Sequence, residues 1–379
     1  MIYFDNAAST PLLQEIIDEI HSLLPEMFGN PSSIHDFGRR ARVVIEDARS
    51  IIAGLLHVAP SEIIFTSGGT EADNTVLWGA VRKLNVQHIV TTRTEHPAVL
   101  NPLSAIAKEH RTEIIYLSVD RNGQPDLTQL EDVLKKKTKP VLVTLMHANN
   151  ETGVLLPLKN VSELCSSSGA YFHSDMVQTF GKCNIDFSKI PVGFASASAH
   201  KFHGPKGVGF LYRDSKNALE PYILGGGQER QMRAGTENTV FIAAMAKALQ
   251  LAYNRMEENL QYITQLKNVM AGKLSAIKGV FFNGDSDKGG LHTILNVAFP
   301  HTAQTEMLLY KLDMNGVAVS GGSACASGTV HQSHVLNELY GVTDNINIRF
   351  SFSKLNTIEE VNKVAGIIYE ILQHEEIEK

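Results

Sequence analysis

From residue 60 to residue 213, short strand-forming runs alternate with stretches of helical pattern. Most of these runs are apolar on both faces, as buried strands of a largely parallel sheet are. The expected strands are Glu62–Thr66, His88–Thr92, Glu113–Leu117, Val141–Met146, Tyr171–Ser174, Phe194–Ala197 and Gly207–Tyr212. Amphipathic segments such as Glu71–Leu84 and Asp126–Lys136 lie between them. This alternation predicts an α/β fold with a mainly parallel, seven-stranded sheet.

The C-terminal part of the chain predicts a second, smaller α+β unit. Residues 239–270 contain no Gly or Pro and have a helical pattern, so we expect one helix that links two domains. Strands of a second sheet are expected at Val280–Phe282, Thr293–Ala298, Val317–Ser320 and Asn347–Ser351, with a closing helix at Thr357–Leu372. We expect a large domain at 15–255 and a small domain made of 1–14 and 256–379.

Composition excludes several classes of protein. The chain has 43% hydrophobic and 20% charged residues and a net charge of −6, which gives no support to nucleic acid as a partner. No apolar stretch approaches the roughly 18 residues of a membrane span, and the first residues have no secretory-signal pattern. The three cysteines are widely spaced, which favours a reducing cytoplasm over a disulfide framework. No CxxC or HExxH pattern is present, so we expect no metal site.

Polar residues follow the expected strands, where open α/β sheets bind ligands. Lys201 follows a strand of small residues and precedes a Gly/Pro-rich turn, so it is a candidate for a Schiff base. Ser198 and His200 could bind an anion beside it. A solvated surface lysine is the other interpretation of Lys201, and composition makes Lys206 an equally available candidate.

Two further runs of residues could bind opposite ends of one cofactor. Asp175 ends an apolar strand and could hold a protonated pyridine nitrogen, with Gln178 donating to a ring oxygen. An Asp that caps the next helix is the alternative. Gly69 and Thr70 open a helix after a strand, where backbone N–H groups favour phosphate. A plain helix cap is the alternative there.

His96 follows a strand and could stack on a planar ring or transfer protons, or it could be structural. Asn150 could bind a substrate carboxylate or simply occupy a turn. Arg349 lies in an expected strand of alternating pattern, and its guanidinium group could bind a carboxylate through two N–H groups. A surface arginine is the alternative. A Schiff-base lysine, an acidic partner, a phosphate cradle and a stacking histidine are together what pyridoxal phosphate (PLP) needs.

Cys325 lies in a run of Gly, Ser and Ala, which predicts an accessible, mobile loop from Ser320 to Gln332. A lone thiol on such a loop could be a nucleophile or a sulfur carrier. An ordinary buried cysteine is the alternative.

The chain resembles the NifS/IscS-type cysteine desulfurases of the class V aminotransferase group, fold-type I PLP-dependent transferases. The resemblance rests on seven ordered motifs and on both ends of the match. They are Tyr3–Ala8, Phe28–Ser33, Thr66–Glu71, Thr94–Pro97, Asn149–Gly153, Ser196–Lys201, Arg233–Glu237, Ser323–Ser327 and Ile348–Ser351.

The resemblance implies a role for each candidate. It implies Lys201, His96 and Cys325 as catalytic residues, with Cys325 accepting sulfur from L-cysteine as a persulfide while L-alanine is released. It implies Gly69, Thr70, Asp175, Gln178, Ser198, His200 and Thr236 as PLP ligands, together with His96 and Lys201, and Asn150 and Arg349 as contacts of the substrate carboxylate. Thr236 would reach the phosphate of a neighbouring subunit, which implies a homodimer.

The resemblance also implies a sulfur-acceptor protein, serving Fe–S clusters, tRNA thiolation or a thio-cofactor. Two departures put its identity in doubt: Gly322 replaces a more usual Ser, and His331-Gln332 replaces Glu-Pro. A selenocysteine lyase, another class V aminotransferase-type enzyme and a non-catalytic sulfur-trafficking scaffold remain the alternative functions.

Overall fold

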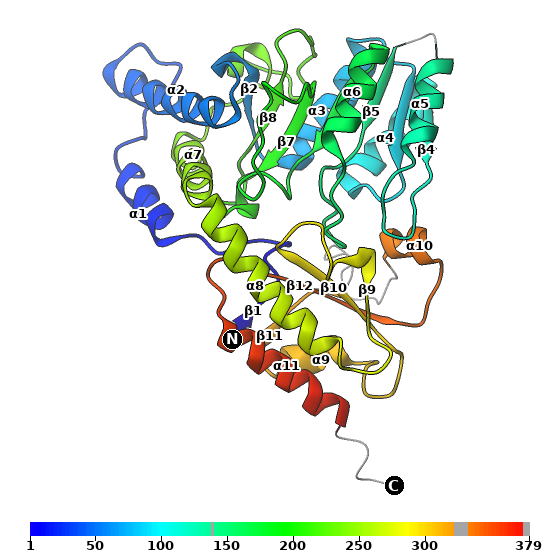
Figure 1. Cartoon of the computed structure of the whole chain (residues 1–379). Coiled ribbons are helices and arrows are strands. Elements are labelled where there is room, and N and C mark those ends of the chain that lie inside the picture. The colour runs from blue at the N-terminus through cyan, green and yellow to red at the C-terminus, as the bar shows by residue number, and fades with distance from the viewer. Residues whose placement is uncertain (138–139, 322–332, 374–379) are drawn as a thin grey trace.

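The computed structural model describes residues 1–137, 140–321 and 333–373, which form two lobes (Figure 1). The upper lobe is built on a seven-stranded sheet with the order β2-β8-β7-β6-β5-β3-β4. Its strands are β2 (Ile63–Thr66), β3 (His88–Thr92), β4 (Glu113–Leu117), β5 (Val141–Thr144), β6 (Tyr171–Asp175), β7 (Phe194–Ser198) and β8 (Gly209–Arg213). Each lies within two residues of its predicted bounds.

The sheet is parallel except at β8, which pairs antiparallel with both β7 and β2. The other neighbouring strands run parallel. The prediction of a mainly parallel α/β sheet is therefore confirmed. Because the parallel strands end at one edge, the polar residues that follow them meet there.

Helices cover both faces of this sheet. One face carries α2 (Asp36–Leu56), α5 (Leu127–Lys136), α6 (Leu158–Ser168) and α7 (Thr239–Asn254), and the other carries α3 (Gly69–Arg82) and α4 (Pro97–His110). Alternate strand residues supply the two cores: Ile63 and Phe65 pack with the first set and Ile64 with the second. The short helix α1 (Gln14–Leu23) packs on α7.

The lower lobe has its own sheet and its own core. Strands β9 (Phe281–Phe282), β10 (Ile294–Phe299) and β12 (Ile346–Ser351) form an antiparallel sheet of order β12-β10-β9. The helices of this lobe are α8 (Met256–Leu274), α9 (Leu308–Met314), α10 (His334–Tyr340) and α11 (Ile358–Gln373). Among the described residues, no helix is long and apolar enough to cross a membrane.

Two expectations about elements were wrong, the first of them in part. Of the expected strand Val317–Ser320, β11 (Val317–Ala318) pairs in parallel with β1 (Ile2–Tyr3) at the start of the chain. Only Ser320 bridges to the second sheet, at Arg349. The expected continuous helix is broken at Arg255, whose backbone is not helical. The break lets α7 pack on α2 in one lobe while α8 packs on α11 in the other.

Candidate active site

Lys201 lies in a one-turn 3-10 helix, Ala199–Lys201, that directly follows β7. Its amine donates hydrogen bonds to the carbonyl oxygens of Ala7 and Ala8, at 2.6 and 2.9 Å. The backbone N–H of Thr10 donates to the carbonyl of His200 at 2.8 Å. The first residues of the chain therefore hold the lysine in place at the carboxyl edge of the sheet.

Asp175 is the last residue of β6 and is buried. Its Oδ1 accepts a hydrogen bond from the backbone N–H of Val177 at 2.9 Å. Burial, together with the nearby Asp73 carboxylate, raises the pKa of Asp175 to about 6, and His96 opposes this rise. Because few neighbouring groups stabilise its negative charge, this buried carboxylate is suited to pair with a cationic ligand.

His96 caps the N-terminus of α4, and its Nδ1 accepts the N–H of Ala98 at 3.1 Å. The Nε2 atom is therefore the ring nitrogen left for a ligand. Burial and the charges of Lys201 and His334 lower the pKa of His96, although Asp175 opposes them. These mutual effects place His96, Asp175 and Lys201 in one site, with the imidazole neutral near pH 7.

The N-terminus of α3 forms a tight cradle. Its cap, Gly68, has φ +153, and a Cβ on Gly209 would lie 2.7 Å from the Gly68 Cα. A Cβ on Gly69 would lie 2.4 Å from Val177 Cγ2. A Cβ built on Gly68 would stand 3.4 Å from the Ser198 hydroxyl, so Ser198 lies beside the cradle. The free N–H groups of this first helical turn, with Ser198 and the exposed Thr70, have the chemistry that phosphate requires.

Of three other predicted ligands, His200 and Gln178 contact protein groups and Thr236 is exposed. The His200 Nδ1 lies 3.2 Å from the Ser9 hydroxyl, and burial with the charge of Lys201 lowers its pKa to about 4. The Gln178 amide donates to the Ala7 carbonyl, which leaves one amide hydrogen for a ligand. Thr236 is exposed in a loop that Arg233 ties to Glu71, in the first turn of α3.

Arg349 projects from β12 and is fully buried. Its Nη2 lies 3.0 Å from Asp5 Oδ1, and its Nη1 donates to the Asn150 carbonyl at 2.8 Å. The Nε–H has no hydrogen-bond partner within the described ranges. The structure thus brings Arg349 and Asn150 together, through the Asn150 backbone carbonyl.

Cys325, Gly322 and His331-Gln332 lie outside the described residues. The residues on either side of this segment are described. Ser320 donates to Asp5 Oδ1, the atom that Arg349 contacts, at 2.7 Å. Ser333 donates to Glu151, and the His334 Nε2 lies 3.0 Å from the carbonyl of Glu95, next to His96. The chain therefore leaves the site beside Arg349 and returns to it beside His96.

Sequence reasoning missed the inner layer of the site. Asp73 and His173 are fully buried, 3.4 Å apart, and burial raises the pKa of Asp73 to about 7. Burial also raises the pKa of Glu95, whose Oε1 accepts the Met146 N–H. The segment Asp5–Ala8 was noticed as a motif but given no role. No spacing in the sequence distinguishes these residues, because their contacts come from distant strands.

Comparison with known proteins places this site in a family. The model of the class-V aminotransferase family matches residues 2–364. A "Putative cysteine desulfurase IscS 1" of Bacillus subtilis (strain 168) is 41% identical, covering 98% of both chains. A solved "NIFS-like protein" superposes with a TM-score of 0.91 at 34% identity, covering 98% of this chain and 99% of that one. The structure "SspA in complex with cysteine" has a TM-score of 0.81 at 29% identity, covering 94% and 100%. The chain belongs to the class-V aminotransferase family.

Proposed function

We propose that this protein is a PLP-dependent cysteine desulfurase, which converts L-cysteine to L-alanine and transfers the sulfur to Cys325 as a persulfide. One observation carries the proposal: the segment that contains Cys325 starts beside Arg349 and ends beside His96, at the site that holds Lys201. The desulfurase relative and the cysteine-bound neighbour support this choice of substrate.

The residues present fit PLP. The cradle at Gly68, Gly69 and Thr70, with Ser198 and His200, would hold the phosphate, and Lys201 would bind the aldehyde carbon. Asp175, buried and with a raised pKa, would pair with the pyridine N–H, while Gln178 would donate its free amide hydrogen to the ring oxygen. PLP supplies an electron sink for the bond changes at the substrate α-carbon.

The protein groups bind the substrate and move its protons. The unpaired Nε–H of Arg349 and the amide of Asn150 would bind the carboxylate of cysteine. Lys201, released from its covalent role, would carry the α-proton, with the Ala7 and Ala8 carbonyls fixing the position of the amine. The neutral His96 would accept the thiol proton through Nε2, since its Nδ1 is already engaged.

The Cys325 thiolate then attacks the sulfur of the bound cysteine. An S–S bond forms as the Cβ–S bond breaks, and the carbon fragment takes up a proton and leaves as alanine. A thiol has a pKa near about 8.5, so a neighbouring base must help to form this thiolate. A sulfur-acceptor protein would then take the outer sulfur atom, in the reducing cytoplasm that the cysteine usage favours.

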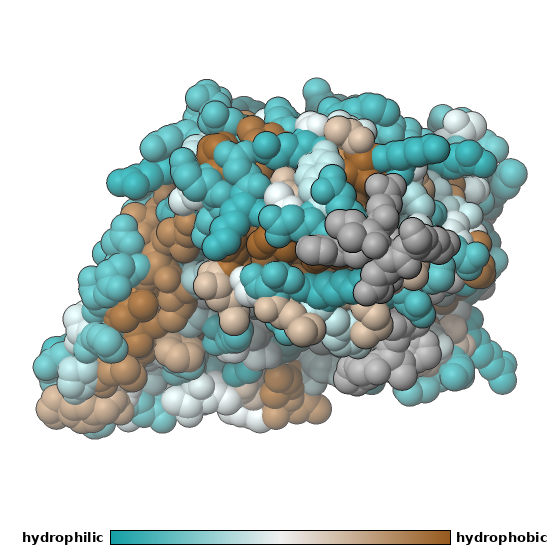
Figure 2. All heavy atoms as spheres, turned by 90° about the horizontal axis from the view of Figure 1, so that it is seen from below, coloured by the Kyte–Doolittle hydropathy of each residue, from teal (hydrophilic) through white to brown (hydrophobic). Residues whose placement is uncertain are grey.

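The assembly is part of the proposal. We propose a large domain at 15–255 and a small domain at 1–14 and 256–379 that carries the cysteine segment. We also propose a homodimer in which Thr236 reaches the neighbouring phosphate. Exposed apolar side chains support an interface: Phe28, Ile34 and Leu224 are 70%, 92% and 80% exposed. Figure 2 shows a hydrophobic band along the left edge, the side on which α1 and α2 lie in Figure 1.

The test uses the PLP-loaded protein with L-cysteine and a reductant. Sulfide and alanine should appear in equal amounts, and the Cys325→Ala variant should lose both. Cys183→Ala is the matched control, because burial raises the pKa of the half-buried Cys183 to about 11 and makes it a poor nucleophile. Full sulfide release by Cys325→Ala would refute the persulfide step. Turnover of L-selenocysteine alone would indicate a lyase of that substrate instead.

A further inference from the structure

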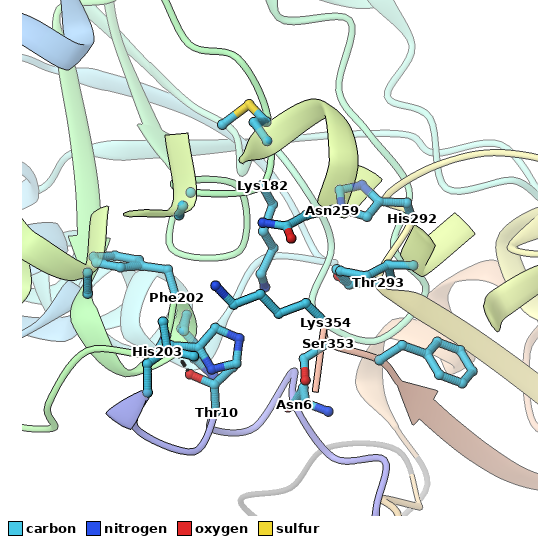
Figure 3. A pocket seen from close by; sticks show the side chains of 18 residues that line it. Asn6, Thr10, Lys182, Phe202, His203, Asn259, His292, Thr293, Ser353 and Lys354 are labelled. Atoms are coloured by element: carbon cyan, nitrogen blue, oxygen red, sulfur yellow. Dashed lines mark hydrogen bonds between the residues drawn. The ribbon is translucent and has the colours of Figure 1, made fainter. Parts of the chain in front are cut away.

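A cavity with apolar and polar side chains in its wall lies next to the candidate active site, where the two lobes meet (Figure 3). The space in it that the centre of a water molecule can occupy is about 40 Å³. One water needs about 10–15 Å³ by the same measure, so the cavity has room for a ligand of only a few atoms. Lys201 contributes to its wall, but His96, Asp175, Ser198 and the glycine cradle do not. Apart from Lys201, the groups assigned to the cofactor therefore lie outside this cavity.

The lining of this cavity is basic. Lys182, Lys354 and His203 line it, and among the described residues of the wall there is no Asp or Glu. Figure 3 shows Lys182 entering from one side and Lys354 from the other. Lys182 lies between β6 and β7 of the upper lobe, whereas Lys354 follows β12 of the lower lobe. The cavity therefore has cationic groups from both lobes and no anion of its own.

The positive charge in the cavity is poorly compensated. Burial and the charge of Lys201 lower the pKa of Lys182 to about 7, and its amine contacts the neutral Gln178 amide oxygen at 3.2 Å. Burial also lowers the pKa of Lys354, and the carboxylates of Glu15 and Glu258 oppose this effect. Neither carboxylate lines the cavity. An anion between the two amines would stabilise both charges.

Two buried polar side chains in the same wall lack partners. The Thr293 hydroxyl is buried and forms no hydrogen bond in the described part of the chain. His292 is only 8% exposed, and its ring likewise forms no hydrogen bond to a described residue. A buried hydroxyl without a partner, such as that of Thr293, is unfavourable in the absence of a ligand. Figure 3 shows both side chains facing the cavity, where a ligand with acceptor oxygens would pair them.

We propose that this cavity binds a small tetrahedral oxyanion, phosphate or sulfate, through Lys182, Lys354 and the Thr293 hydroxyl. Both anions offer the charge and the several acceptor oxygens that these groups require. The neutral ring of His292, whose pKa burial lowers to about 4, can donate one N–H bond without adding charge. Because its ligands come from both lobes, the anion stabilises the junction between them.

The first experiment measures thermal unfolding of the PLP-loaded protein, because the empty phosphate cradle would bind the same anions. Sulfate or phosphate is titrated at constant ionic strength, with chloride and acetate as comparison anions. The melting temperature should rise and saturate with sulfate and with phosphate, as expected for one site. A rise without saturation, equal in all variants, would be a general salt effect and would contradict the proposal.

Two variants test the ligands. Lys354→Met should weaken the apparent affinity at least tenfold, whereas Lys278→Met, at an exposed lysine outside the cavity, should not change it. Thr293→Val should weaken binding while leaving the anion-free protein as stable as before, because the hydroxyl has no partner to lose. Unchanged affinity in both cavity variants would refute the assignment.

A third measurement needs no variant. Crystals of the PLP-loaded protein soaked in selenate should show an anomalous peak between the amines of Lys182 and Lys354. A map without that peak, at a selenate concentration that saturates the melting curve, would overturn the proposal. These measurements do not depend on turnover of cysteine. They therefore test the anion site independently of the proposed desulfurase activity.

Discussion

At the scale of single residues, the choice between Lys201 and Lys206 can be decided by covalent trapping. Reduction of the PLP-loaded protein with borohydride should add one cofactor mass per chain in the wild type, and none in Lys201→Ala. Lys206→Ala is the matched control, because Lys206 is exposed and only four residues of chain separate the two lysines. Trapping that survives Lys201→Ala and disappears in Lys206→Ala, as read by mass spectrometry, would reverse the assignment.

Asp175 makes stability depend on pH in the cofactor-free protein. Because the folded-state pKa is raised to about 6, the bound proton stabilises the fold fully below the ordinary pKa, and this contribution is lost as pH rises through 6. Asp175→Asn cannot ionise and keeps an oxygen for the Val177 N–H. The variant should therefore be more stable than wild type at pH 8, by up to about 3 kcal/mol.

Urea unfolding at pH 8 and at pH 4 measures this difference, which should vanish at the lower pH. The exposed Asp47→Asn is the control, and it should change neither value. The same Asp175→Asn protein should hold PLP more weakly at pH 8, as measured by dialysis. A wild type that is the more stable of the two without cofactor at pH 8 would contradict the buried-charge argument.

The sequence predicted site residues at the ends of strands but not the residues that support them. Lys201, Asp175 and His96 follow apolar strands, and a polar residue in that position is visible in a sequence. Asp73 and His173 lie inside a helix and a strand, where nothing marks them before the sheet brings them together. Asp5 was overlooked as the partner of Arg349 because 344 positions separate them.

At the scale of elements, the glycine cradle depends on a missing side chain at the start of β8. In Gly209→Ala, the new Cβ would lie 2.2 Å from the Ala197 carbonyl and 2.7 Å from the Gly68 Cα. Overpacking of this kind costs about 1–3 kcal/mol, and the shift of Gly68 should also weaken PLP binding. Gly54→Ala in α2 is the control, because a Cβ there meets no atom within 4 Å and should stabilise the helix slightly.

Unfolding by urea and titration with PLP check the two effects separately. Gly209→Ala with normal stability and normal PLP affinity would show that the cradle tolerates a shift. Lower stability with normal PLP affinity would show that the new Cβ disturbs the pairing of β7 with β8 but not phosphate binding.

At this scale, strands buried on both faces were predicted more accurately than the short strands of the other lobe. The seven strands of the large sheet were located to within two residues because a strand covered on both faces must be apolar throughout. The short strands of the other lobe are less distinctive, and β11 was placed in the wrong sheet because its partner, β1, has only two residues. The break at Arg255 was invisible, since each half of 239–270 favours a helix and only the packing of the two lobes separates them.

At the scale of the whole molecule, the proposed dimer can be tested at its apolar surface. Ile34→Asp should shift the protein towards the monomer and reduce activity, because each site would lose Thr236 of the neighbouring copy. Val342→Asp, at a residue that is 85% exposed and follows α10, is the control for adding charge to a surface. Analytical ultracentrifugation gives the mass. A wild type that is monomeric at micromolar concentration would refute the dimer.

The pairing of β1 with β11 has a consequence for how the enzyme is made. Ile2 and Tyr3 are synthesised long before their partners, Val317 and Ala318. The carbonyls of Ala7 and Ala8, which hold Lys201, belong to the segment that this pairing anchors. A nascent chain can therefore begin to assemble its large sheet early, whereas the segment that holds Lys201 is anchored only after β11 has been synthesised. A chain whose synthesis stops before β11 would lack this anchor.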